Sequence, residues 1–215
     1  ADLGPDGHPV VGIPVPPGPG MRRMFAGGRV QTLRRLRIGQ PAVRATRVVG
    51  EVTKEGRSGP LRFVTVRHEV RQAGELAVGD EQDLVYRTPG GQPAPEAATA
   101  PDAPDAPSTP SGRDAALALE VDEALLFRFS ALTYNGHRIH YDRAWCRHEG
   151  YADLVVHGPL QALMMSELLR RNGVGLVGRT FAYRLVAPMV GTGRLDVVAA
   201  ADGLGSGAEA YGAGR

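Results

Sequence analysis

One stretch with almost nothing to bury, residues 88–113, decides how the rest of this chain can be organised. Seven prolines stand in it among Ala, Ser, Thr and Asp, so neither a helix nor a central strand can persist there. Segments of this length and composition connect domains rather than cross a compact fold. We therefore predict a disordered or polyproline-like linker over 88–113, an N-terminal domain over 1–87 and a C-terminal domain over 114–215.

Composition narrows the class of protein further. The chain has 215 residues, of which 42% are hydrophobic, enough to bury a proper core. No apolar run approaches the roughly 18 to 20 residues that span a bilayer, and residues 1–5 lack the order of a signal peptide. We expect a cytoplasmic protein with no membrane segment. The single cysteine, Cys146, excludes an internal disulfide and an all-cysteine metal site.

The formal net charge of +2 conceals a basic N-terminal half. Between Arg22 and Arg71 cations recur at short intervals, opposed only by Glu51, Glu55 and Glu69. A solvated strand face explains such a run, but arginine also favours phosphate and carboxylate partners. Both interpretations stay open from the sequence.

The N-terminal domain is predicted to be β-rich. A Pro- and Gly-rich extended lead-in covers residues 4–20. Segments rich in Val and Thr follow it, broken by turn residues at 39–41 and 55–60. The predicted strands cover residues 29–33, 42–53, 61–71 and 83–87.

The C-terminal domain mixes strands with one helix. Apolar residues at helical spacing predict a helix over 160–172, with Pro159 near its first turn and Gly173 beyond its end. Predicted strands cover residues 124–130, 179–186 and 194–200. The Gly-rich tail could hold one short edge strand at 208–211 or nothing ordered.

A faint internal repeat links the two domains. The strand, turn and strand that follow Gly28 parallel those that follow Gly178. On that register the first copy lacks the residues where its own helix would lie, and the second copy ends early. The pattern predicts a fragment of a longer protein.

The stretch from Phe129 to Asp142 concentrates the residues that could carry chemistry. His140 is the best acid–base candidate, because an imidazole can take and return a proton near neutral pH. Asn135 can hold a water molecule through its amide, or it can serve turn chemistry beside Gly136. Asp142 can orient His140, act as a second acid–base group or face away.

A second candidate piece lies at the start of the predicted helix. His157, Gly158 and Pro159 precede its apolar stripe. A helix start offers unpaired N–H groups and the positive end of the helix dipole, so Gly158 could stabilise a developing oxyanion. An ordinary start of a helix explains the same residues.

Together, the two pieces resemble a known family. A Gly-containing loop that ends in Ile139-His140, followed by Val156-His157-Gly158 and a buried helix, is similar to the MaoC-like enoyl-thioester hydratases. The sequence of these motifs resembles most that of the hydroxyacyl-thioester dehydratase type 2 and mesaconyl-CoA hydratase branch. Residues 25–29, 52–59 and 81–87 also resemble the first repeat of that branch.

The resemblance implies an α+β double hot-dog fold, with two curled antiparallel sheets and a complete central helix only in the C-terminal repeat. It places the catalytic residues of the family at Asn135 and His140 and the thioester-binding amide at or near Gly158. The family has Asp where this chain has Asn135, which leaves His140 as the main proton carrier. The substrate-binding residues are expected to be Arg138, Tyr141, Asp142, Arg143 and His157.

The resemblance also implies the reaction, the addition or removal of water across the double bond of an acyl thioester. The partner is then an acyl-CoA or acyl-carrier thioester, whose phosphates give the arginines a use. We expect a homodimer, no metal or redox cofactor, no nucleic acid and no membrane partner. Thioester hydrolysis on the same fold, or a non-catalytic acyl-thioester or nucleic-acid binding module, are the alternatives.

Overall fold

The computed structural model describes residues 2–18, 21–56, 59–87, 116–200 and 208–212. These residues form two compact units, each assembled from segments far apart in the chain. The first unit contains residue 2 together with residues 9–87 and 175–186, and the second contains residues 3–8, 116–174 and the described residues from 187 onwards. The predicted linker, residues 88–113, lies outside the described residues. The predicted division at 1–87 and 114–215 stays a prediction.

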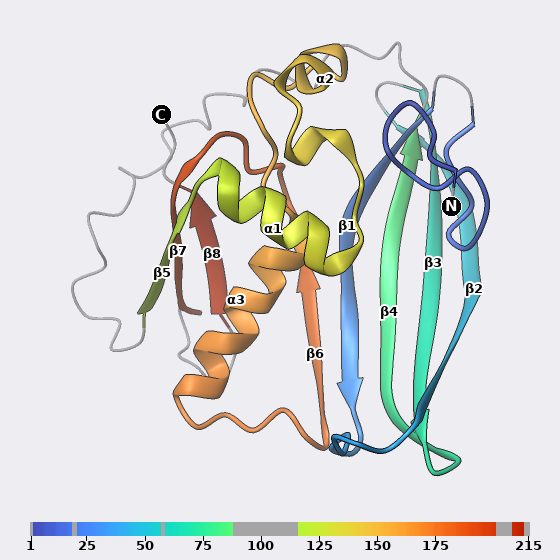
Figure 1. Cartoon of the computed structure of the whole chain (residues 1–215), viewed down its shortest axis with the longest axis vertical. Helices are drawn as coiled ribbons and strands as arrows, with labels where there is room; N and C mark the ends of the chain where they lie inside the picture. The colour runs from blue at the N-terminus through green and yellow to red at the C-terminus, as the bar shows by residue number, and fades with distance from the viewer. Residues whose placement is uncertain (1, 19–20, 57–58, 88–115, 201–207, 213–215) are drawn as a thin grey trace. The chain divides into compact units, whose positions relative to one another are not determined.

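A five-stranded antiparallel sheet forms the first unit, in the order β2-β3-β4-β1-β6 (Figure 1). Hairpins join β2 to β3 and β3 to β4, and β6 comes from the C-terminal half to pair with β1. The strands are β1 (Arg22–Thr32), β2 (Ala42–Gly56), β3 (Gly59–Gln72), β4 (Glu75–Arg87) and β6 (Arg179–Arg184). The described residues of this unit contain no helix.

One face of this sheet carries a small hydrophobic core. The side chains of Val64, Val66, Leu84 and Tyr86 are buried in it, with alternate residues of β3 and β4 pointing the same way. The Tyr86 hydroxyl donates to the Val15 carbonyl at 2.7 Å, so the lead-in segment is fixed to the sheet at this point.

Several arginines of the first unit form ion pairs with glutamates of the same sheet. Glu69 accepts hydrogen bonds from Arg47, Arg67 and Arg71, and those to Arg47 and Arg67 hold its pKa at about 2. Glu81 accepts from Arg29 and Arg67. These arginines of the basic run therefore lie on the strands of the sheet and pair there with glutamates.

The second unit contains a three-stranded sheet and the helices. Its sheet has the order β5-β7-β8, and helix α3 packs against it (Figure 1). The elements are β5 (Ala116–Val121), α1 (Glu123–Thr133), the 3₁₀ turn η1 (Arg138–His140), α2 (Arg143–His148), α3 (Gly158–Arg171), β7 (Gly193–Ala199) and β8 (Ala208–Gly212). The buried face of α3 includes Leu160, Met165 and Leu168.

The main error of the sequence prediction falls on residues 124–130, which form helix α1 rather than a strand. Asp122 caps this helix, because its carboxylate accepts a hydrogen bond from the Leu125 N–H at 2.7 Å. Leu126 and Ser130, four residues apart, form its buried side. Strand β5, with alternating exposed and half-buried residues, was not predicted.

Most other predicted elements are confirmed. The predicted strands of the first half lie within β1 to β4 apart from one residue at Leu33, and the predicted helix corresponds to α3. The predicted edge strand at 208–211 is β8, which pairs with β7. Among the described residues, no helix is both long and apolar enough to cross a membrane.

Candidate active site

The loop between α1 and α2 is shaped by its own backbone. Helix α1 ends at Tyr134, whose φ of 53° is left-handed, and the Asn135 N–H donates to the Ser130 carbonyl at 2.9 Å. The Asn135 side-chain oxygen then accepts from the His137 N–H at 3.2 Å. This is turn chemistry of the type that Asn favours, and it leads the chain directly into η1, where His140 lies.

His140 is buried and held by one hydrogen bond. Its Nδ1 lies 2.7 Å from the Val155 carbonyl oxygen, and a carbonyl only accepts, so the proton is on Nδ1 and the lone pair of the neutral ring is on Nε2. Burial, followed by the neighbouring His157, lowers the pKa of His140 well below its usual range, against the opposing effect of the Val155 bond. The ring is therefore neutral at pH 7 and able to accept a proton.

His157 is stacked on His140. The ring centroids are 3.6 Å apart and the planes differ by 18°. His157 is fully buried, and burial, with a smaller effect of His137, lowers its pKa to about 4. Its Nε2 lies 2.9 Å from the Ser130 hydroxyl, so α1 and the start of α3 hold this ring between them.

Gly158 follows His157 and begins α3. The hydrogen bonds of the first turn run from the N–H groups of Leu160 and Gln161 to the His157 carbonyl. Pro159 has no N–H, so Gly158 supplies the N–H at the very start of the helix, where donors have no partner within the helix. Gly158 directly follows His157, whose ring stacks on that of His140.

The side-chain oxygen of Asn135 accepts a hydrogen bond from the loop backbone, as described above. Within the described part of the chain, no acceptor is paired with its Nδ2 group, and the residue is half-buried. The turn function and the predicted water-holding function are therefore compatible, because they use different atoms of one amide.

Three of the predicted substrate-binding residues support the loop. Arg138 donates to Asp142 through Nε and Nη2, at 3.0 and 2.6 Å, and its guanidinium lies 4.4 Å from the centroid of the Trp145 ring. Asp142 caps α2 by accepting from the Trp145 N–H, and the Arg138 bond holds its pKa below the usual range. The Tyr141 hydroxyl donates to the Gly136 carbonyl at 2.7 Å.

Arg143 lies apart from the imidazoles. It is exposed and bridges two carboxylates, those of Glu123 at 2.6 Å and Asp153 at 2.8 Å. These pairs tie α2 to the start of α1 and to the loop before α3. The predicted substrate-binding roles of Arg138 and Arg143 stay predictions.

Four further members of this group were not predicted from the sequence: Asp6, His8, Ser130 and Glu149. His8 is buried and its ring centroid lies 4.2 Å from that of His137. His137 Nε2 lies 3.2 Å from Glu149, which also accepts from the Trp145 indole at 2.6 Å. Only the polar Asp6-Gly7-His8 within a Pro- and Gly-rich segment was a signal for any of them.

One set of side chains in this group has the composition of a metal site. The ligand atoms of Asp6, His8 and His137 all lie within 4.8 Å of one another. Two imidazoles and a carboxylate suit zinc and similar ions. In the structure, however, His8 Nδ1 lies 2.8 Å from Asp6 and His137 Nε2 is paired with Glu149.

Cys146 of α2 contacts the backbone of η1. It is fully buried and its Sγ donates to the Ile139 carbonyl at 3.0 Å. Burial, followed by the charge of Asp153, raises the pKa of this thiol to about 11. The residue is therefore a protonated packing residue.

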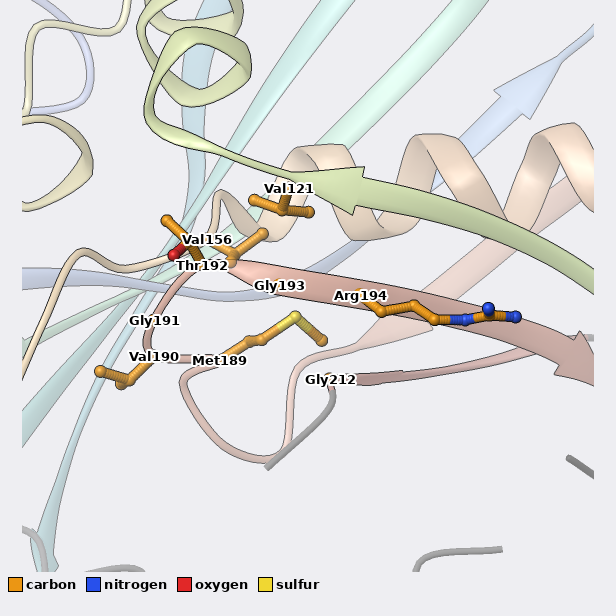
Figure 2. A pocket seen from close by; sticks show the side chains of 9 residues that line it. All are labelled: Val121, Val156, Met189, Val190, Gly191, Thr192, Gly193, Arg194 and Gly212. Carbon is orange, nitrogen blue, oxygen red and sulfur yellow. The ribbon is translucent and has the colours of Figure 1, made fainter. Parts of the chain in front are cut away.

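A small pocket lies beside strand β7 (Figure 2). Its lining is mostly apolar side chains and glycines, and Arg194, its only charged member, pairs with Asp196 at 2.8 Å. The lining residues are Val121, Val156, Met189, Val190, Gly191, Thr192, Gly193, Arg194 and Gly212. The lining of this pocket contains no carboxylate, imidazole or thiol.

A buried neutral imidazole, an amide and the N–H at a helix start together form a candidate site for proton transfer. The protein is thus of the α+β hot-dog class, with a candidate acid–base site. Residues 1–191 match the family model of hydroxyacyl-thioester dehydratase type 2, and the chain belongs to this family. The resemblance inferred from the sequence is confirmed.

A curated relative and two solved structures are similar to this chain. The mesaconyl-C(4)-CoA hydratase of Chloroflexus aurantiacus is 47% identical over 193 residues, which are 88% of this chain and 65% of the relative. A MaoC-like dehydratase from Phytophthora capsici is 15% identical with a TM-score of 0.61, covering 92% of this chain and 69% of its own. HtdX of Mycobacterium tuberculosis is 13% identical with a TM-score of 0.55, covering 86% and 70%.

The two structural likenesses show the fold, which is the double hot-dog predicted from the sequence. The chain spans slightly less than two thirds of the length of the curated relative that it matches.

Proposed function

We propose that this protein is a hydro-lyase that adds water to, or removes it from, the α,β double bond of an acyl thioester. The observation that carries the proposal is the state of His140, a buried neutral ring whose Nδ1 proton is held by the Val155 carbonyl. That leaves Nε2 as a base next to a helix start. The family to which the chain belongs supports the same reaction class.

The reaction follows from these positions. Asn135 holds a water molecule, and His140 Nε2 removes one of its protons while the oxygen bonds to the β-carbon of the enoyl group. Negative charge then develops on the thioester oxygen, where the Gly158 N–H stabilises it. The imidazolium returns the proton to the α-carbon. Dehydration is the same sequence of steps in reverse.

The relative named a mesaconyl-C(4)-CoA hydratase supports a carboxylated enoyl-CoA as the substrate. Arg138 and Arg143 are the cations proposed to bind the extra carboxylate, with Tyr141, Asp142 and His157 completing the binding residues. Both arginines already pair with carboxylates of the protein. A substrate carboxylate therefore binds by exchange with Asp142, Asp153 or Glu123.

The assembly and cellular context belong to the same proposal. We propose a cytoplasmic homodimer that binds coenzyme A thioesters and neither nucleic acid nor membrane, and that uses no metal or redox cofactor. The first repeat, over residues 1–87, supplies substrate binding and the second, over residues 114–215, supplies the acid–base residues. Light scattering of the purified protein tests the dimer, and a monomer mass contradicts it.

The activity is tested by following the conjugated absorbance of an enoyl-CoA panel that includes a dicarboxylic ester. Loss of absorbance with the thioester intact supports hydration. Release of free thiol instead indicates a thioesterase, and salt-sensitive oligonucleotide binding without turnover indicates a nucleic-acid binding module. Each of the last two results overturns the proposal.

The role of His140 is tested with His140→Ala. We expect the hydration rate to fall about 10²- to 10⁴-fold, as for removal of a general base. His68→Ala is the matched control, because this half-buried imidazole bonds to Thr46 in the first unit and should leave the rate within about twofold of wild type. An unchanged rate in His140→Ala contradicts the assignment.

A further inference from the structure

The N-terminal segment Leu3–His8 belongs to the same compact unit as the catalytic loop. Its backbone accepts two hydrogen bonds from Arg138, one from the N–H to the Asp6 carbonyl at 2.9 Å and one from Nη1 to the Pro5 carbonyl at 2.9 Å. The second bond joins residues 133 positions apart in the chain. The segment therefore contacts η1 directly at its first residue.

The two backbones also meet at a pair of glycines. A Cβ atom on Gly7 would lie 1.8 Å from the Gly136 carbonyl oxygen, and one on Gly136 would lie 2.6 Å from the Gly7 oxygen. Gly7 also has a φ of +88°, which disfavours any side chain. No other residue fits at this crossing without moving the loop.

Asp6 and His8 form a closed pair beside this crossing. One oxygen of Asp6 accepts from the His8 backbone N–H at 2.9 Å, and the other lies 2.8 Å from His8 Nδ1. Although burial raises the pKa of Asp6, its bonds to His8 lower it more, so the carboxylate is ionised. The pair fixes the His8 ring in one orientation.

The fixed ring continues into a row of imidazoles. His8 lies against His137 at 4.2 Å, His137 meets His140 edge-on at 5.7 Å, and His140 stacks on His157. Glu149 from the end of α2 faces His137 from the other side. The titratable groups that face His140 are thus His157 from the start of α3, His137 from its own loop and His8 from the N-terminal segment.

We propose that Asp6 and His8 are positioning residues of the active site. Asp6 orients the His8 ring, His8 supports His137, and this contact holds the Asn135–His140 loop in the geometry that proton transfer needs. The inference rests on the proposed function and deepens it. A metal bound by Asp6, His8 and His137 is the competing interpretation, but His8 Nδ1 already pairs with Asp6 and His137 Nε2 with Glu149.

The first test is kinetic and uses His8→Gln and Asp6→Asn in the full chain. A loop displaced by a fraction of an ångström should lower kcat about 10- to 100-fold, with KM within about threefold and with a shifted acid limb of the pH–rate profile. Asp6→Glu should restore part of kcat. The control is His68→Gln, which should retain wild-type kinetics.

A merely structural role would lower the melting temperature of both variants without moving the pH profile of the folded enzyme. Equal kcat and an equal pH profile in His8→Gln and wild type would overturn the proposal.

The second test needs no activity. Titration of the imidazole ¹⁵N resonances of the ligand-free protein should show a shifted titration of His140 in Asp6→Asn. Unmoved resonances overturn the positioning role even if the protein is a hydratase. Shifted resonances in a protein that turns over no thioester leave the positioning role standing and refute the proposed function.

Metal analysis of the protein as purified decides the competing interpretation. One equivalent of zinc in wild type that is lost in His8→Gln would overturn the proposal, because the cluster would then be a metal site. No bound zinc at added micromolar zinc supports it.

Discussion

The stacked rings of His140 and His157 are buried bases that the protein keeps neutral. Burial lowers both pKa values, that of His157 to about 4 from an ordinary 6.5, because a charged imidazole loses its hydration there. The unfolded chain binds these protons at a higher pH than the folded chain does. Folding is therefore coupled to the loss of protons at these two residues.

This coupling predicts a pH dependence of stability. The stabilisation is complete above the unfolded pKa of about 6.5 and is lost as the pH falls from there toward the folded values, by about 1.4 kcal/mol per unit of pKa difference. Urea unfolding at pH 7.5, 6, 5 and 4.5 should show a falling free energy of unfolding. His157→Gln should have a weaker slope than wild type, and equal slopes contradict the prediction.

Ser130 offers a second prediction for a single residue. Its hydroxyl is the partner of His157 Nε2, and His157 Nδ1 is already a buried atom with no hydrogen-bond partner among the described residues. Ser130→Ala should therefore lower the free energy of unfolding by about 1 to 3 kcal/mol. The control Ser166→Ala removes only a bond within α3 and should change it by less than about 0.5 kcal/mol.

Helix α1 shows how a local contact decides an element. Residues 124–130 contain Leu and Phe in a short apolar run, which periodicity alone does not separate from a strand. The decisive feature is Asp122, which both caps the helix and is followed by Glu123 in its first turn. The same helix brings Ser130 to His157.

The cap of α1 is directly testable. Asp122→Ala should lower the free energy of unfolding by about 1 kcal/mol, because the Leu125 N–H loses its acceptor. Asp122→Ser keeps an oxygen at the cap and should retain most of the stability. Chemical denaturation of the three proteins measures both effects, and equal loss in the two variants would show that the cap is not the cause.

Strand β1 lies between β4 and β6, and a substitution in it gives a second prediction at the scale of an element. A Cβ atom on Gly28 would lie 2.3 Å from the Glu81 carbonyl and 2.9 Å from the Tyr183 hydroxyl. Gly28→Ala should destabilise the protein by about 1 to 3 kcal/mol through overpacking. Gly50→Ala in β2 is the matched control, since its Cβ would meet the Thr65 side chain at an ordinary 3.7 Å, and it should be neutral or stabilising.

Whether the sequence predicts a feature depends on whether that feature is caused by a local pattern or by contacts between segments far apart in the chain. Strands β2 and β3 and helix α3 could be predicted, because alternation, turn residues and helical spacing are local patterns. His140 and Gly158 stay predicted site residues, which the sequence suggested from local motifs. Asp6, His8 and Glu149 could not be predicted, because their roles come from segments that meet only in the fold.

At the scale of the whole molecule, each compact unit contains a segment from the opposite end of the chain. The sheet of the first unit takes β6 from the C-terminal half, and the second unit takes residues 3–8 from the N-terminus. The composition of residues 88–113 predicts a boundary but does not reveal this exchange, because strand pairing across a long separation leaves no local pattern.

The exchange predicts the behaviour of a chain cut between residues 100 and 101. The fragment 1–100 lacks β6 and the fragment 101–215 lacks Asp6 and His8, so each is missing a part of its unit. We expect each fragment alone to be poorly folded by circular dichroism and thermal unfolding. When both are produced together, a tag on one should retain the other, and two independently stable, monomeric fragments contradict this expectation.

The proposed reaction makes the low reactivity of the buried Cys146 thiol important. An enoyl thioester is an electrophile that sulfur attacks at the same β-carbon that water attacks, and only the thiolate is strongly reactive. A pKa of about 11 and a hydrogen bond to the Ile139 carbonyl keep the sole thiol of the chain protonated beside the loop that handles the substrate. We therefore expect Cys146 to resist alkylation by an enoyl thioester.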